Sequence, residues 1–142
     1  MNNLGLATMV FIVPEPFERA LKLIRSALNK EDLEILLEMD VSRRLRQKLG
    51  IGLGQCKVLC VDSAASTVEA MSADPGAGMF LPARLVVSCC QGLTQIDLLN
   101  PASVQGSALP VGVKIPITRL LTRMIQTIEK VAMRKVASHI GT

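Results

Sequence analysis

The segment 116–137 places the strongest constraint on the fold, because its apolar side chains recur every three or four residues. The apolar set is Ile117, Leu120, Leu121, Met124, Ile125, Ile128, Val131 and Ala132. Such spacing predicts a long amphipathic helix with one apolar face. Burying each large apolar side chain contributes roughly 1.5–3 kcal/mol, so this helix must pack against another apolar surface.

Strand-like segments are expected to provide that surface. They are residues 6–13, 33–41, 56–61, 79–89 and 93–99. The first is a continuous apolar run, whereas segment 33–41 alternates apolar and acidic residues and predicts a strand with one wet face. Gln91-Gly92 predicts a hairpin turn, and Pro82 indicates an edge, a bulge or the start of regular pairing.

Three further helices are expected between the strands, over residues 17–28, 42–49 and 64–72. Asp40 or Ser42 can cap the second of these helices, and Ser63 can help to cap the third. Asp74-Pro75-Gly76 predicts a tight turn, and residues 100–114 predict a long loop. This order of elements predicts an α+β protein, and no linker divides residues 1–142 into more than one domain.

The composition limits the functional classes. Of 142 residues, 49% are apolar, but the three aromatic residues are all Phe, so the core is expected to be aliphatic. The scarcity of aromatic rings removes the stacking platforms that single-stranded nucleic-acid binders use. Residues 1–113 carry 10 basic and 11 acidic side chains, whereas residues 114–142 carry 6 and 1. The net positive charge therefore belongs to the terminal helix. Separately, residues 138–142 are expected to form a frayed tail.

No targeting or membrane-spanning segment is expected. The apolar run 4–13 is too short to cross a bilayer as a helix, and no positive residue precedes it. We therefore expect a cytoplasmic location. Because thiols are kept reduced in the cytoplasm, the four cysteines are expected to be free: Cys56, Cys60, Cys89 and Cys90. Because His139 is the only histidine, we expect neither a metal site nor a bound cofactor.

Glu38 and Asp40 are the first candidate site. Two residues apart on a strand, their carboxylates project from one face and suit acid–base work or a hard cation. The favoured interpretation is a solvated strand face, with Asp40 capping the helix that follows.

A basic cluster follows, made of Arg43, Arg44, Arg46 and Lys48. It can receive a phosphate or a partner's acidic surface, but the acidic strand before it offers an internal counter-charge. Without interleaved aromatics, specific nucleic-acid recognition is not expected. The glycine run 50–54 leads into a strand, without the helix N-terminus that lets phosphate loops bind anions, so we interpret it as a flexible turn.

Cysteine chemistry is the third possibility. Cys60 lies near a strand end close to a helix start, where a thiol can become reactive. With no histidine nearby in sequence, a small core residue is the favoured interpretation. A thiol redox sensor that uses Cys60 or the Cys89–Cys90 pair stays open as an alternative.

Several short motifs occur in a fixed order: Glu38-Met39-Asp40-Val41, Lys48-Leu49-Gly50, Asp74-Pro75 and Phe80-Leu81-Pro82-Ala83-Arg84. Together they resemble a widespread prokaryotic family, domain of unknown function 302, whose pattern contains E-x-D-V, K-L-G, D-P and L-L-P-C-R. The match runs without gaps over residues 38–87. The resemblance implies a fold similar to the TATA-binding-protein class, with a curved antiparallel sheet covered on one face by the first and last helices.

This chain departs from the family pattern at two places. The family's C-N-P is replaced by Asp62-Ser63-Ala64, and the cysteine of L-L-P-C is replaced by Ala83. Both family cysteines are therefore missing, which argues against a thiol or metal role shared with the family.

The leading functional hypothesis is a non-catalytic binding or assembly domain, expected to form homodimers and without assigned catalytic residues. The alternative is a small-ligand or metal-dependent enzyme or sensor that uses Glu38, Asp40, Lys48 and Arg84 around a groove. Neither a specific nucleic-acid partner nor insertion into a membrane is expected.

Overall fold

The computed structural model describes residues 7–132 and 134–136. The strands are β1 (Thr8–Val13), β2 (Glu34–Asp40), β3 (Cys56–Asp62), β4 (Ala83–Cys90), β5 (Leu93–Leu99) and β6 (Arg134–Val136). The helices are α2 (Phe17–Lys30), α3 (Val41–Leu49), α4 (Ala64–Ala73), α5 (Pro101–Gln105) and α6 (Val111–Glu129), with a 3-10 helix η1 (Pro75–Met79). The expected frayed tail, residues 138–142, lies outside the described residues.

The described strands form one sheet in the order β2-β3-β4-β5-β1-β6, and every neighbouring pair is antiparallel. β4 and β5 are joined by the predicted hairpin turn, in which Gln91 and Gly92 have φ of 52° and 81°. Positive φ at both central residues is the geometry of a type I′ turn, which matches the twist of paired strands.

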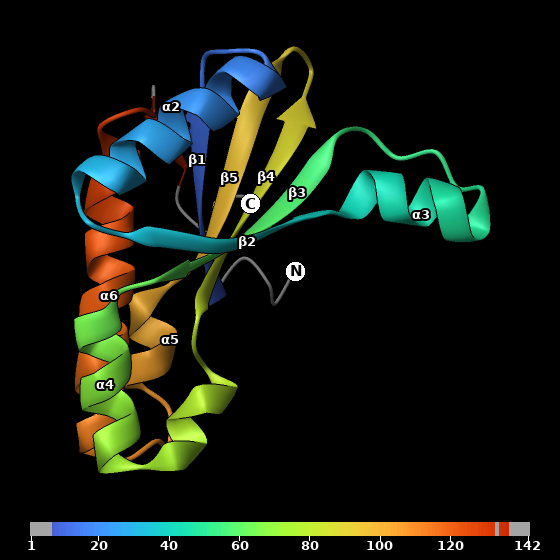
Figure 1. Cartoon of the computed structure of the whole chain (residues 1–142). Helices are drawn as coiled ribbons and strands as arrows, with labels where there is room; N and C mark the ends of the chain where they lie inside the picture. The colour runs from blue at the N-terminus through green and yellow to red at the C-terminus, as the bar shows by residue number, and fades with distance from the viewer. Residues whose placement is uncertain (1–6, 133, 137–142) are drawn as a thin grey trace.

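Helices α2 and α6 cover one face of the sheet (Figure 1). The strands supply Phe11, Leu59, Leu85 and Ile96 to the core between the layers, and the helices supply Leu21, Ile24, Leu120 and Met124. All eight side chains are fully buried. The predicted α+β class, with an antiparallel sheet covered on one face by the first and last long helices, is confirmed.

The bounds predicted for the terminal helix were wrong at both ends. α6 begins at Val111, where the Val113 and Lys114 amides donate to the Pro110 carbonyl, and it carries Pro116 inside it. The helix ends at Glu129, and the chain continues into β6, which pairs with β1. A strand at this place extends the sheet beyond β1.

Two other predicted segments were also wrong. Residues 79–82 do not belong to β4. The 3-10 helix η1 runs through Met79, and β4 begins only at Ala83, after Pro82. The predicted loop 100–114 contains α5, whose first turn is capped by the Asn100 side chain accepting from the Ala102 amide. Ser63 begins α4 but makes no capping hydrogen bond with its side chain.

The cations of α6, and Lys130 directly after it, form ion pairs and hydrogen bonds within the fold. Arg119 forms an ion pair with Glu69 of α4 at 3.0 Å, and Lys130 pairs with Glu31 at 3.3 Å. Arg123 donates to the Glu31 carbonyl at 2.6 Å. The basic face of the terminal helix therefore fastens it to α4 and to the end of α2.

Candidate functional site

Glu38 faces the helix-covered side of the sheet and is held by α2. Its two carboxylate oxygens accept from Nε and Nη2 of Arg25, both at 2.7 Å, and Lys57 lies 3.8 Å away. The bidentate hydrogen bond from Arg25, followed by the charges of Arg25 and Lys57, lowers the pKa of Glu38 below its usual range. A carboxylate held in this way joins β2 to α2 and remains ionised.

Asp40 caps α3, as one of the two sequence interpretations predicted. Its Oδ1 accepts from the Arg43 amide at 2.8 Å and from the Ser42 hydroxyl at 2.9 Å. The hydrogen bond from the Arg43 amide, then that from Ser42, lowers the pKa of Asp40. These bonds fix where α3 leaves the sheet.

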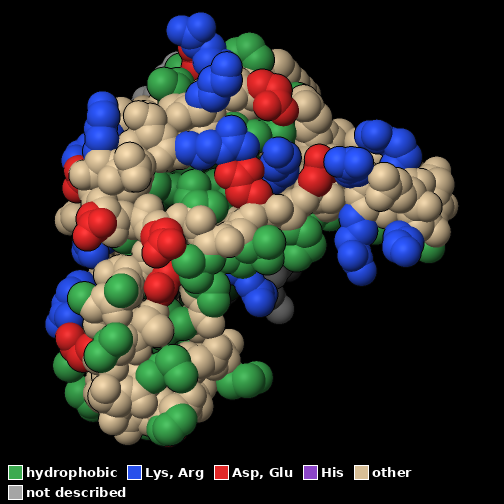
Figure 2. Space-filling view, in the orientation of Figure 1, with side chains coloured by type: hydrophobic (Ala, Val, Ile, Leu, Met, Phe, Trp, Pro, Cys, Tyr) green, Lys and Arg blue, Asp and Glu red, His purple; other side chains and the backbone are tan. Residues whose placement is uncertain are grey.

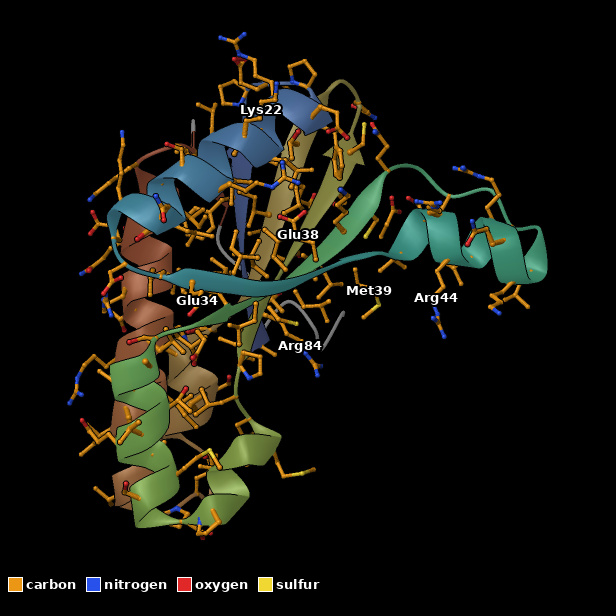
Figure 3. The ribbon with its side chains drawn as sticks, viewed as in Figure 1. Lys22, Glu34, Glu38, Met39, Arg44 and Arg84 are labelled. Carbon is orange, nitrogen blue, oxygen red and sulfur yellow. The ribbon has the colours of Figure 1, made fainter. Side chains whose placement is uncertain are left out.

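Arg84 lies on the other face of the sheet from Glu38. It pairs in register with Cys60 of β3, whereas Glu38 pairs with Leu59, whose side chain points to the helix-covered core. Figure 3 shows Glu38 and Arg84 on opposite sides of β2. Lys48 lies at the exposed far end of α3. The structure thus brings Cys60 next to Arg84 but does not gather Glu38, Asp40, Lys48 and Arg84 around one groove.

Beside Arg84 the structure has a pocket of about 440 Å³. Its lining side chains are mostly apolar and come from η1 and the η1–β4 connection, the end of β5, α5 with the loop after it, and α6. The lining residues are Gly78, Met79, Phe80, Leu81, Pro82, Ala83, Arg84, Leu99, Val104, Leu109, Ile117 and Leu121. Ligand pockets have volumes of roughly 300–1,000 Å³, with mostly apolar walls and few polar groups.

Of the described residues that line this pocket, Arg84 is the one with a charged side chain. Among the described residues, no hydrogen bond or ion pair to its side chain is found, and its side chain is exposed. Its neighbour in register is Cys60 on β3, and Leu99 of β5 lines the same pocket. A guanidinium that has no partner at an apolar pocket can bind a carboxylate or phosphate through a bidentate pair of hydrogen bonds.

A second hollow, of about 550 Å³, lies between the end of α2 and β2. Its lining includes Arg25 and Glu38, whose charges neutralise each other, together with Asp32, Glu34 and Asn29. Because the cation is already paired, this hollow offers an anion no free partner. We therefore regard the apolar pocket beside Arg84, the Arg84 pocket, as the candidate site.

The pairing of Arg25 with Glu38 makes a pH-dependent contribution to stability. Because the folded pKa of Glu38 is lowered, this contribution is complete above the ordinary glutamate pKa of about 4.3 and is lost as the pH falls through the folded pKa. A double-mutant cycle with Arg25→Met and Glu38→Gln, measured by urea unfolding at pH 7, should give a coupling of about 1 kcal/mol.

The exposed pair Glu15–Arg19, also at 2.7 Å, is the matched control and should give a smaller coupling, about 0.3–0.5 kcal/mol. A coupling between Arg25 and Glu38 that stayed constant from pH 7 to pH 3 would contradict this account.

The cysteines differ in exposure. Cys89 and Cys90 are exposed, Cys60 is buried, and burial, with the charges of Asp40 and Asp97, raises the pKa of the Cys56 thiol. We expect iodoacetamide to modify Cys89 and Cys90 well before Cys56 and Cys60, as followed by peptide mass spectrometry. Modification of Cys60 as fast as Cys89 would show that the thiol is accessible and would favour the redox alternative.

Within residues 7–132 and 134–136, no three His, Cys, Asp or Glu side chains are grouped so that they could hold a metal ion. Over the same ranges, none of the helices is both long enough and apolar enough to cross a membrane.

The sequence did not reveal the Arg84 pocket, because four separate parts of the chain build it. The one available signal is the segment Phe80–Arg84, which supplies five neighbouring residues of its lining. Met79 lines the pocket and is 85% exposed, but it lies in η1, whereas the sequence predicts a strand there. Leu109 and Val104 lie in the segment expected to be a loop.

Comparisons with known proteins agree with this fold. The family model described as "Domain of unknown function DUF302" matches residues 9–131. The crystal structure of an uncharacterized conserved protein DUF302 from Bacillus stearothermophilus superposes with a TM-score of 0.80 at 19% sequence identity. The alignment covers 89% of this chain and 98% of that one, which shows a shared fold. No curated protein matches the chain.

Proposed function

The chain belongs to the family described as domain of unknown function DUF302. We propose that it is a non-catalytic binding domain for small molecules with an apolar body and an anionic head. The observation that carries this proposal is Arg84, which has no ion pair with any described residue, beside a mostly apolar pocket of about 440 Å³. The apolar body would occupy the pocket, and the head would pair with the guanidinium.

The composition of the pocket supports binding rather than catalysis. Among the described residues of its lining there is no histidine, carboxylate, hydroxyl or thiol side chain, so these residues offer neither a general base nor a nucleophile. Arg84 can orient an anion through the N–H groups of its planar guanidinium. Binding energy in such a site comes from apolar burial and one charged contact.

The test compares two probes of equal length that differ in the head group, octanoate and octan-1-ol. Calorimetric titration of the full chain should show tighter binding of octanoate. The Arg84→Met variant keeps an apolar side chain at the pocket but loses the charged contact, so octanoate should bind about tenfold more weakly. Binding of octan-1-ol should change little.

Arg44→Met on α3 is the matched control, since it removes the same charge from a distant exposed position. We expect it to leave octanoate affinity unchanged. Equal losses in both arginine variants would mean that only net charge attracts the anion, and equal affinity of wild-type and Arg84→Met protein for octanoate would overturn the proposal.

Self-association is a second candidate, favoured by the edge strand β2. β2 is the last strand of the sheet beside β3, and its residues Leu36, Leu37 and Met39 are exposed apolar side chains. An exposed apolar edge strand is a template for pairing with another chain. We therefore also propose a homodimer in which β2 of two copies pairs antiparallel.

Light scattering at rising protein concentration tests the dimer. The wild-type chain should double its mass, and the Leu37→Lys variant, which places a charge on the edge strand, should remain monomeric. A monomer at high concentration in the wild-type protein would eliminate the dimer without affecting the Arg84 pocket.

A further inference from the structure

The helix α3 leaves the body of the protein as an arm. In Figure 1 it extends away from the layers formed by the sheet, α2 and α6. Ser42 is the one buried residue of α3, and its hydroxyl joins the Asp40 carboxylate to the Cys56 amide at the base of the arm. Beyond this base the helix and the loop up to Gln55 are mostly exposed. We call residues 41–55 the basic arm.

The four cations of the basic arm lie in solvent. Arg43, Arg44, Arg46 and Lys48 are all exposed, and no ion pair involving them is found among the described residues. Figure 2 shows their blue side chains on both sides of the arm. The net charge of the whole chain is +4, so the arm alone carries an excess equal to that of the protein. The acidic strand neutralises little of this charge, because Glu38 pairs with Arg25 and Lys57, and Asp40 interacts with Arg43 alone among the arm's cations.

The tip of the basic arm is apolar. Leu49 ends the helix at 66% exposure, and the loop after Gly50 presents Ile51 and Leu53, both 48% exposed. Gly50 has a φ of +66°, a left-handed conformation that ends the helix and turns the chain. Three aliphatic side chains thus lie in solvent beside four exposed cations.

We propose that the basic arm docks on the surface of an anionic lipid bilayer, with its cations on the headgroups and its tip in the interface. An exposed segment that combines several cations with aliphatic side chains has the two components of an interfacial anchor, namely charge for the headgroups and apolar surface for the interface. Each cation near an anionic surface contributes about 1 kcal/mol, or about fivefold in partitioning. The aliphatic tip adds a contribution that salt does not screen.

A bilayer explains both features of the arm. A nucleic acid would use the cations, but the arm has no aromatic side chain on which bases could stack. An acidic protein surface would likewise leave the exposed aliphatic tip without a role. This proposal is independent of the Arg84 pocket, because the arm contributes no residue to its lining.

Sedimentation with vesicles tests the proposal. The full chain should bind vesicles of 70% phosphatidylcholine and 30% phosphatidylglycerol at 100 mM salt, and it should bind pure phosphatidylcholine at least tenfold more weakly. Arg44→Gln with Lys48→Gln should weaken anionic binding more than tenfold. Leu49→Ser with Ile51→Ser should weaken the binding that remains at high salt.

Lys22→Gln with Lys30→Gln is the matched control, because it removes two exposed cations from α2. It should weaken vesicle binding less than threefold, and thermal melting should show that all variants remain folded. Equal losses in the control and the arm variant would overturn the proposal. So would equal binding to both vesicle types, or binding of the arm to a single-stranded RNA oligonucleotide without binding to vesicles.

Discussion

Leu98→Ala should lower the free energy of unfolding by about 2–5 kcal/mol, whereas Leu99→Ala should lower it by about 1 kcal/mol or less. The two leucines are neighbours in β5, so their side chains point to opposite faces of the sheet. Leu98 is 1% exposed beneath the helices, and Leu99 is 41% exposed. Truncating Leu98 leaves a cavity in the core, while truncating Leu99 removes a partly solvated side chain.

Urea unfolding of both variants measures this difference, with circular dichroism as the probe. The pair shares residue type, strand and substitution, so helix or strand propensity cancels in the comparison. Similar losses in both variants would contradict the register of β5 and the covering of one face of the sheet.

Thr94→Val should lower the free energy of unfolding by about 1–3 kcal/mol. Thr94 is fully buried in β5, and its hydroxyl donates to the Glu15 carbonyl at 2.8 Å. This bond ties the β4–β5 hairpin to the connection between β1 and α2, which is 79 residues away in sequence. Valine preserves the shape but leaves the carbonyl without this donor.

Thr127→Val is the matched control. Thr127 is also buried, but its hydroxyl donates to the Arg123 carbonyl one helical turn earlier, where the helix itself supplies a backbone partner. Urea unfolding should show a loss below about 0.5 kcal/mol for Thr127→Val. A loss as large as that of Thr94→Val would mean that the hydroxyl bond to Glu15 has no special role.

The regular elements were predictable because their periodicities are local. Phe17–Lys30 shows an uninterrupted helical period, and Leu93–Leu99 alternates between the hairpin turn and Asn100, so both were placed within two residues. The sequence predicts that α6 begins at Pro116, because a proline in a helix usually lies in the first turn. Here it lies inside a helix that begins five residues earlier.

The candidate site was less predictable, because it depends on which distant segments meet. Glu38 and Asp40 look alike in sequence, yet one pairs with Arg25 on α2 and the other caps α3. The role of Arg84 follows from the apolar walls brought to it by α5 and α6, which no local pattern near residue 84 reveals.

Methyl NMR of the methionines tests the Arg84 pocket most directly. Met79 lines the pocket, whereas Met39 lies on β2 outside it. Titration with octanoate should shift the Met79 methyl signal in the wild-type chain, leave the Met39 signal in place, and cause a much smaller shift in Arg84→Met. A Met39 shift without a Met79 shift, or no shift of Met79 at saturating octanoate, would contradict the assignment of this pocket as the binding site.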